Sequence, residues 1–321
     1  MPIPGNLSSY PAFHFDKALE PLLSDPSTII GVLGLPLLAA ILFAGSALLM
    51  KRTTRWHIEI WRVSFVCNVV SMITFQPFWL LAGDLPPWSL WWQPFGVALL
   101  YVVGQVLTLT SLSQGEISVA APVLGLKIVF VPIFLWLLGA GLLPVSTWLA
   151  CLGATLAVML LNSTDGASER GKVLYSIVTA TSGAAAFALF DVCIQLWSPT
   201  WGPGAFLPVM MGMSTLLSLA LFPFFKQPLR AISRDAWPTL SGAALLIALQ
   251  AVAIVASVAF WEQVAVSNVV YSTRGLWSLA AVWMLGRYLG ASDSSLTPRV
   301  FMLRSAGALL LFASIALLVF V

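Results

Sequence analysis

Long apolar runs alternate with short polar or charged connections along most of this chain. From residue 29 onward each run is about twenty residues, the length at which an α-helix crosses the hydrocarbon core of a bilayer. Residues 1–28 are more polar and are expected to form an interfacial lead-in. The pattern predicts ten membrane-spanning helices: Ile29–Met50, Trp61–Leu81, Trp88–Leu112, Ile117–Leu138, Leu143–Leu161, Val173–Leu196, Gly204–Phe225, Trp237–Phe260, Val264–Leu285 and Val300–Val321.

The fourth and ninth spans resemble each other. The first reads ISVAAPVLGLKIVFVPIFLWLLG from Ile117 to Gly139, and the second reads VAVSNVVYSTRGLWSLAAVWMLG from Val264 to Gly286. Laid over one another without a gap, they place Lys127 on Arg274. The two cations therefore lie at one depth of two related helices, as expected of an internally duplicated transporter with a midplane site.

The polar connection after the fifth span divides the spans five and five. Both groups end in a helix with a small-residue cluster, around Gly153 and Gly307, of the kind that lets helices approach closely in lipid. The predicted fold is therefore all-α and polytopic, with repeats at 29–162 and 173–321 joined by a linker at 163–172. Because five is odd, the two repeats must be inserted in opposite orientations.

Composition agrees with a membrane protein and excludes several other classes. The chain is 60% hydrophobic and 8% charged, far from the balance of soluble domains. Its net charge of +3 comes from residues scattered at span ends, so nucleic acid is not an expected partner. The expected partners are membrane lipid and a small anion, a homodimer stays open, and no metal or other cofactor is expected.

Lys and Arg residues concentrate on one side of the predicted membrane. They flank the odd-numbered connections, as with Lys51, Arg170, Lys226 and Arg287, whereas the even-numbered side carries acids such as Asp84. The positive-inside rule then predicts a multi-pass protein of the plasma (inner) membrane with both termini outside.

Lys127 and Arg274 are the leading candidates for a substrate site. An arginine at the centre of a membrane helix costs roughly 3 kcal/mol on insertion scales, so it normally faces a polar interior and has a function. A guanidinium offers a bidentate fork for carboxylate or phosphate, and an ammonium adds a movable point charge. Asp191 is the only carboxylate well inside a span, so it can neutralise one of the two cations and leave the other for a ligand. Asp191 is interpreted as a counter-ion, with a proton-carrying role as the alternative.

Other polar residues are weaker candidates for the same site. Helical spacing places Ser267, Tyr271 and Ser278 on the same side as Arg274, with Thr273 beside them. Gln105 and Gln250 occupy roughly equivalent positions in the third and eighth spans. Buried serines and glutamines also hold membrane helices together, so that interpretation stays open for each of them.

The spans and their end sequences resemble the drug/metabolite transporter superfamily. The resemblance is carried by the five-plus-five arrangement, by FLWLLG and AVWMLG at the ends of the fourth and ninth helices, and by LACLGATLAVMLL and RSAGALLLFASIALL in the fifth and tenth. Many EamA-type members have Glu after the Gly that closes the fourth helix, whereas this chain has Ala140 there and Arg287 after Gly286.

The resemblance implies functional roles for the two cations. Superfamily branches that carry sugar phosphates and other organic phosphates hold the phosphate with basic residues of the fourth and ninth helices, and Lys127 and Arg274 match by helix and depth. The second adjacent cation of those ninth helices is missing, since Thr273 and Gly275 flank Arg274, which leaves phosphate and carboxylate open. Well-known members have both termini in the cytoplasm, opposite to the orientation that the loop charges predict.

The sequence therefore predicts a secondary transporter of a small organic anion that works by alternating access, with exchange as one mode. A flippase for lipid-linked phosphate and an exporter of amino acids or other metabolites are the alternatives. The chain has no GxSxG, HExxH, Walker or Rossmann pattern and no His/Asp or Cys/His group, so it is not expected to be an enzyme.

Overall fold

The computed structural model describes residues 26–114, 119–120, 123–139, 143–161, 170–278, 280 and 298–320. These residues form helices and connections without any strand, which confirms the all-α prediction. The main elements are α1 (Pro26–Ile29), η4 (Ile30–Gly34), α2 (Leu35–Thr53), α3 (Ile60–Phe75), η6 (Gln76–Leu81), α4 (Trp92–Gln114), α6 (Lys127–Leu137), α7 (Val145–Leu161), α8 (Arg170–Trp201), α9 (Pro203–Ser218), η9 (Leu219–Phe224), α10 (Trp237–Trp261), α11 (Val264–Tyr271) and α13 (Pro298–Phe320).

Each predicted span contains at least part of one of these helices. Within the described residues, six helical stretches are long and apolar enough to cross a membrane, and three shorter ones are apolar. The beginning of the fourth span, the end of the ninth, and the linker prediction at 163–169 fall on residues outside those described. The spans built on α3 and α9 both finish as 3-10 helices that contain a proline, Pro77 in η6 and Pro223 in η9. Proline lacks the N–H that continues an α-helix, which explains both changes.

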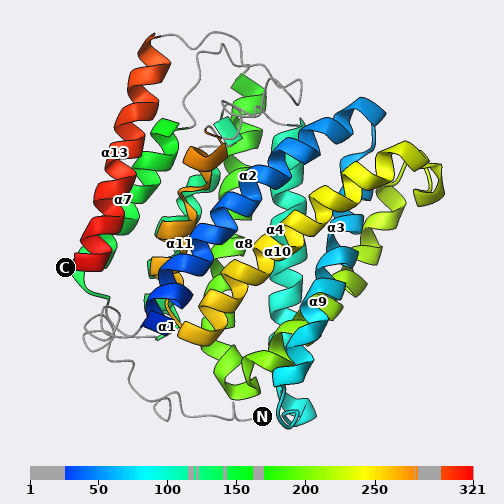
Figure 1. The fold of residues 1–321 in the computed structure, drawn as a ribbon, viewed down its shortest axis with the longest axis horizontal. Helices are drawn as coiled ribbons and strands as arrows, with labels where there is room; N and C mark the ends of the chain where they lie inside the picture. Colours follow the sequence, from blue (N-terminus) through cyan, green and yellow to red (C-terminus); the bar gives the residue numbers. More distant parts are fainter. Residues whose placement is uncertain are drawn as a thin grey trace.

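The packing of the helices has an internal exchange symmetry. We pair each helix with the one five spans later: α2 with α8, α3 with α9, α4 with α10, α6 with α11, and α7 with α13. The pair α2–α10 then exchanges with α8–α4, α3–α10 with α9–α4, and α6–α8 with α11–α2, and all six pairs are in contact. The contacts α3–α9 and α7–α13 each map onto themselves. In Figure 1 helices of the two groups accordingly lie side by side, as α2 and α10 do across the front of the molecule.

Two individual contacts lie on this exchange axis. The Thr215 hydroxyl of α9 donates to the Asn68 carbonyl of α3, and these residues are 147 positions apart, the same offset as Lys127 and Arg274. At the other self-paired contact, a Cβ on Gly307 of α13 would lie 2.8 Å from the Ala157 carbonyl oxygen of α7. Glycine here lets the two backbones approach, as the small-residue clusters predicted.

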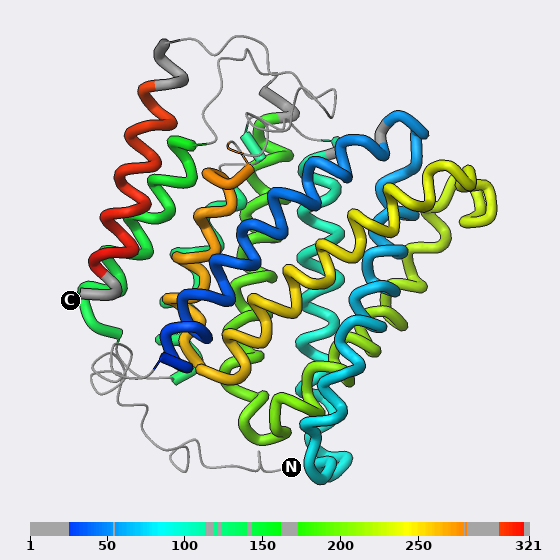
Figure 2. The backbone as a smooth tube through the Cα atoms, viewed as in Figure 1, coloured from blue at the N-terminus to red at the C-terminus, as the bar shows by residue number. Residues whose placement is uncertain are grey.

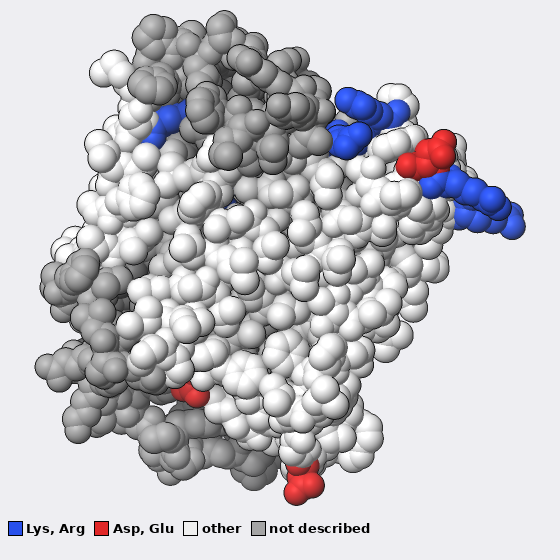
Figure 3. Space-filling model, in the orientation of Figure 1, with Lys and Arg blue, Asp and Glu red and all other residues white. Residues whose placement is uncertain are grey.

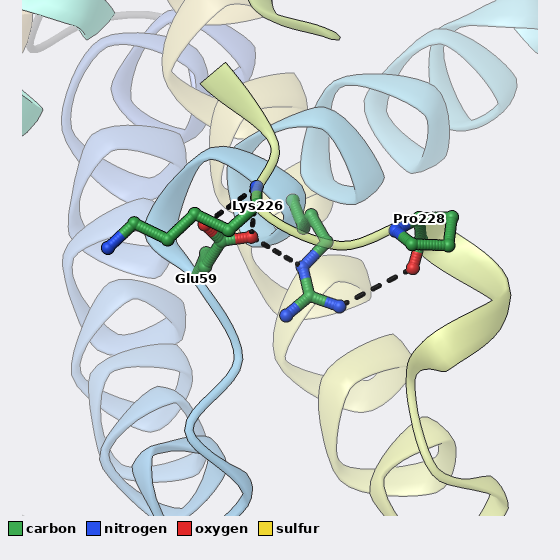
Figure 4. A network of polar contacts seen from close by, with 4 residues as sticks. Glu59, Lys226 and Pro228 are labelled. Atoms are coloured by element: carbon green, nitrogen blue, oxygen red, sulfur yellow. Dashed lines mark hydrogen bonds and ion pairs between the residues drawn. The ribbon is translucent and has the colours of Figure 1, made fainter. Parts of the chain in front are cut away.

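Charged residues gather at one end of the bundle. The α2–α3 and α9–α10 connections lie together there (Figure 2) and carry the exposed cations visible in Figure 3. Glu59 ties these connections to each other: its carboxylate pairs with Nε of Arg62 at 3.0 Å and accepts the Lys226 backbone N–H at 3.0 Å, while Arg62 donates to the Pro228 carbonyl at 3.5 Å (Figure 4). The opposite end has Asp84 after η6 and Glu262 after α10.

Replacing Gly307 by valine is expected to separate α13 from α7. The added side chain has no room against Ala157 and Leu160, and overpacking of this kind typically costs about 1–3 kcal/mol. Thermal unfolding of the purified protein, followed by tryptophan fluorescence, should show a lower midpoint. Gly212→Ala is the matched control, because a Cβ there meets nothing within 4 Å. Equal midpoints for both variants would contradict the close approach.

Candidate functional site

Lys127 forms a buried ion pair with Asp191 in the middle of the bundle. Lys127 is the first residue of α6, and its Nζ lies 2.6 Å from Oδ2 of Asp191 on α8. The Asp191 side chain is 5% exposed and that of Lys127 is 17% exposed. The lysine has apolar neighbours on its own helix, so its partner had to come from another one, and Asp191 is that partner. The distance is typical of a strong charge-assisted hydrogen bond.

Asn268 joins a third helix to this pair. Its side-chain amide on α11 donates to Oδ2 of Asp191 at 2.8 Å and to the Val264 carbonyl at 3.0 Å. The same carboxylate oxygen therefore receives an ammonium from α6 and an amide from α11. Phe187, one turn before Asp191 on α8, has its ring centroid 6.0 Å from the Lys127 ammonium. We call Lys127, Asp191 and Asn268 the polar triad.

Arg274 has a different environment from Lys127. It follows α11, and its guanidinium carbon lies 5.0 Å from the ring centroid of Phe43 on α2 and 4.7 Å from that of Tyr271. The two rings meet edge to face, with centroids 6.4 Å apart. Cation–π contacts of this kind contribute from about 0.5 to 2 kcal/mol each. Among the described residues no carboxylate forms an ion pair with Arg274.

The two intramembrane cations therefore differ in their partners. Lys127 forms an ion pair with Asp191, and no carboxylate of the described residues neutralises the charge of Arg274. Arg274 lies six positions beyond Asn268, about 9 Å along a helix axis at 1.5 Å per residue. The described contacts place Lys127 against α8 and Arg274 against α2, and they contain no direct contact between the two side chains.

The remaining candidates of the ninth span serve its packing. Ser267 exchanges a hydrogen bond with Ser257 of α10 at 2.9 Å, and Thr273 donates to the Val270 carbonyl of its own helix at 2.8 Å. Tyr271 is 7% exposed and packs under Arg274. Ser278 is half-buried and has no hydrogen bond to a described residue. The polar side of this span is therefore shared between α2 and α10.

Gln105 belongs to a second polar cluster on the exchange axis. Its amide makes two reciprocal hydrogen bonds of 3.0 Å with the Asn68 side chain, to which the Tyr101 hydroxyl also donates at 3.3 Å. The Tyr101 ring in turn contacts Phe187 and Phe190 of α8, which links this cluster to the polar triad. Gln250, its counterpart on α10, is half-buried and has no hydrogen bond to a described residue.

Sequence reasoning underestimated Asn268 and missed Phe43 and Phe187. Asn268 is a polar residue of the same span as Arg274, a signal that was available, but its partner depends on how α8 and α11 are placed. Phe43 and Phe187 give no signal in the sequence, because phenylalanines are common in membrane helices. Only their position over a cation distinguishes them.

Comparison with known proteins connects this architecture to a family. Residues 29–163, which span the chain from Ile29 to the end of α7, match the model of the EamA-like transporter family. This segment is therefore similar to EamA-like transporters, which belong to the drug/metabolite transporter superfamily. Members of the EamA-like family are multi-pass membrane transporters, so the match indicates membrane transport as the general function.

The other comparisons concern the fold alone. One protein crystal structure aligns with a TM-score of 0.68 over 89% of this chain and 95% of its own, at 15% sequence identity. That likeness covers both halves of the chain, so the similarity in fold extends beyond the segment that matches the family model. No curated protein sequence matches the chain.

Breaking the polar triad from one side should destabilise the protein. Lys127→Gln leaves Asp191 as a buried charge without its cation, and Asp191→Asn leaves Lys127 without its anion. Removing one partner of a buried pair costs about 3–5 kcal/mol, whereas replacing both partners is much milder. The midpoint of thermal unfolding should therefore fall in each single variant and recover in the double variant. A double variant that is no more stable than the singles would contradict a coupled pair.

Proposed function

We propose that this EamA-like protein is a secondary transporter of a small organic anion. The observation that supports the proposal is the distribution of charge at mid-membrane. Asp191 neutralises Lys127, and Arg274 retains a positive charge that no described carboxylate neutralises. A fixed cation inside a membrane protein calls for an anionic ligand in the transport cycle.

Magnitudes favour a ligand over packing as the reason for Arg274. Placing an arginine at mid-membrane costs at least about 3 kcal/mol. Two cation–π contacts return from about 1 to 4 kcal/mol together, and the upper value requires full desolvation of the guanidinium. Arg274 is only half-buried, so the return is at the lower end. A carboxylate or phosphate bound bidentately to the guanidinium would supply the larger compensation.

Lys127 is the second contact for the anion in this proposal. In the empty carrier the ammonium is held by Asp191, which keeps it oriented and lowers the cost of its charge. A substrate with two negative charges, or one anionic group large enough to span both cations, can draw Lys127 from Asp191 while it binds Arg274. Phosphorylated metabolites and carboxylates both satisfy this requirement.

Alternating access is supported by the exchange symmetry of the helices. The main contacts between the two five-helix groups either have an exchanged counterpart or map onto themselves, so rearranging the groups can convert one access state into an equivalent opposite one. The unpaired Arg274 opposes movement of the empty carrier through apolar surroundings, and a bound anion lowers that barrier. This difference favours exchange of one anion for another.

Arg274→Gln should remove most of the affinity for anions. Losing one partner of a buried charged hydrogen bond costs 2–5 kcal/mol, which corresponds to about 30-fold weaker binding or more. Thermal-shift titration with sugar phosphates, nucleotides, dicarboxylates and amino acids would identify the ligand class, and titration of the variant would follow. Lys226→Gln, at an exposed cation of the charged end, is the control and should bind normally. Unchanged affinity in Arg274→Gln, or a wild type that binds no anion, would refute the proposal.

The orientation in the membrane is a further part of the proposal. Exposed cations occupy the end with the α2–α3 and α9–α10 connections (Figure 3), which the positive-inside rule places in the cytoplasm. A single cysteine at Gly83, introduced after replacing the three native cysteines by serine or alanine, should react with a membrane-impermeant maleimide from outside intact cells. A cysteine at Gln227 should react only after the membrane is opened. The reverse labelling would establish the opposite orientation.

A further inference from the structure

The polar triad lies at the inner end of a series of polar residues that reaches the surface. Gln195 is one helical turn beyond Asp191 on α8, and its Oε1 accepts the Val264 N–H at the start of α11 at 2.8 Å. Residues 262 and 263 directly precede Val264 and connect α10 to α11. The order from the centre outward is therefore Asp191, Gln195, Gln263 and Glu262.

Two groups in this series are buried without a hydrogen-bond partner. Nε2 of Gln195 is a donor and Oε1 of Gln263 is an acceptor, and their side chains belong to residues that are 2% and 7% exposed. Orphaned polar atoms are rare in protein interiors, and a buried water commonly satisfies such donors and acceptors. Packing alone gives no reason for an unpaired donor on Gln195 and an unpaired acceptor on Gln263 in this series.

The outer end of the series is an acid suited to collecting protons. Glu262 ends α10 in the left-handed conformation, with φ 56°, and is half-buried. Burial raises the pKa of its carboxyl above the usual value. Protonation is therefore easier at Glu262 than at a fully exposed glutamate.

We propose that Asp191 takes up a proton from the Glu262 end when an anion draws Lys127 away, so that the proton and the anion cross together. This inference rests on the proposed function. In the step, the hydrogen bond from Lys127 Nζ to Asp191 Oδ2 breaks, an O–H bond forms on Asp191 with a proton from solution, and the lysine stays an ammonium bound to the anion. Asn268 remains beside Asp191, and its Nδ2 can keep donating to Oδ2 while the new proton is carried by Oδ1.

Charge balance supports one proton for each monovalent anion. The empty carrier holds Lys127 and Arg274 as cations and Asp191 as an anion, a net charge of +1 from these three residues. With a monovalent anion and a protonated Asp191, the net charge is again +1. The loaded and empty carriers then carry the same net charge, so the membrane potential acts on both alike even though only the loaded carrier has Arg274 paired, whereas an anion without a proton would change the net charge.

Few other titratable groups face Asp191 from the helices around it. Lys127 on α6 is paired with Asp191. Tyr101 on α4 packs against Phe187 and Phe190, which lie on α8 together with Asp191. Tyr271 and Arg274 belong to the span of α11. Cys193 is buried on α8 itself. The helices α9 and α10 contain no titratable side chain. Asp191 is thus the one described carboxylate in this part of the bundle.

The test measures proton uptake by the full-length protein. Dimethyl phosphate and gluconate, each a monovalent probe of one anion class, are added outside proteoliposomes that contain a pH-sensitive dye. The wild type should acidify the interior as the probe enters. The affinity of the carrier for the probe should rise as the pH falls, because binding is coupled to proton uptake. Asp191→Asn should bind the probe without acidification, and its binding curve supplies the correction for the probe's own titration.

Variants of the outer residues separate the proton route from the anion site. Gln263→Met and Glu262→Gln should slow acidification severalfold and leave the affinity unchanged, while Asp84→Asn, at the same end but outside the series, should behave as wild type. Gln263→Met removes no described side-chain hydrogen bond and is therefore expected to fold. It keeps the proton route testable even where Asp191→Asn does not fold. Binding without acidification in the wild type, or equal rates in all variants, would overturn the proton route. Absence of binding would instead refute the anion transporter itself.

Discussion

The pairing of Lys127 with Asp191 is the interaction on which the other features of the bundle depend. It joins α6 to α8, and through Asn268 it also fixes α11, so three helices from both halves of the chain meet at one carboxylate oxygen. In a medium without water each of these groups needs the others, because an unpaired charge there costs several kcal/mol. Because Asp191 pairs with Lys127, it does not neutralise Arg274, and the described residues contain no second carboxylate that does.

The two halves share a framework but differ in chemistry. Exchange of equivalent helices reproduces the pattern of packing, including the Asn68–Thr215 contact on the axis. At the 147-residue offset, however, Asp191 corresponds to Ala44, so the first half has no carboxylate opposite Arg274. Its place beside the guanidinium is taken by the rings of Phe43 and Tyr271. A scaffold with symmetric helix packing and a single described acid at this depth therefore gives one paired cation and one cation without a described carboxylate partner.

The described contacts also distinguish residues that hold the bundle together from residues that are free to act. The Ser267 hydroxyl forms a hydrogen bond with Ser257 of α10, and the Thr273 hydroxyl donates to a carbonyl of its own helix. The Gln105 amide forms hydrogen bonds with Asn68. These are the satisfied polar groups expected between membrane helices. By contrast, Nε2 of Gln195 and Oε1 of Gln263 are buried without a hydrogen-bond partner among the described residues, which is why they support a functional interpretation.

The amino-acid sequence alone is enough to predict the spans, the all-α class and the two intramembrane cations. These features are local: a run of about twenty apolar residues must be helical in lipid, and a charge within it is conspicuous wherever its neighbours lie. The equivalence of Lys127 and Arg274 can also be predicted from the sequence, because the two spans that carry them align without a gap. The charge count even showed that one cation would lack an acid, although it could not say which.

Three contacts depend on how the helices pack in three dimensions: the ion pair of Asp191 with Lys127, the hydrogen bond from Asn268 to Asp191, and the position of the Phe43 ring over Arg274. Those contacts depend on the rotation and crossing of helices that are far apart in sequence, and apolar helix surfaces in lipid carry no periodic signal that fixes them. The hydrogen bond from Val264 to Gln195, which brings residues 262 and 263 to the series leading outward from Asp191, has the same origin. A pattern along one helix cannot reveal which face of another helix will meet it.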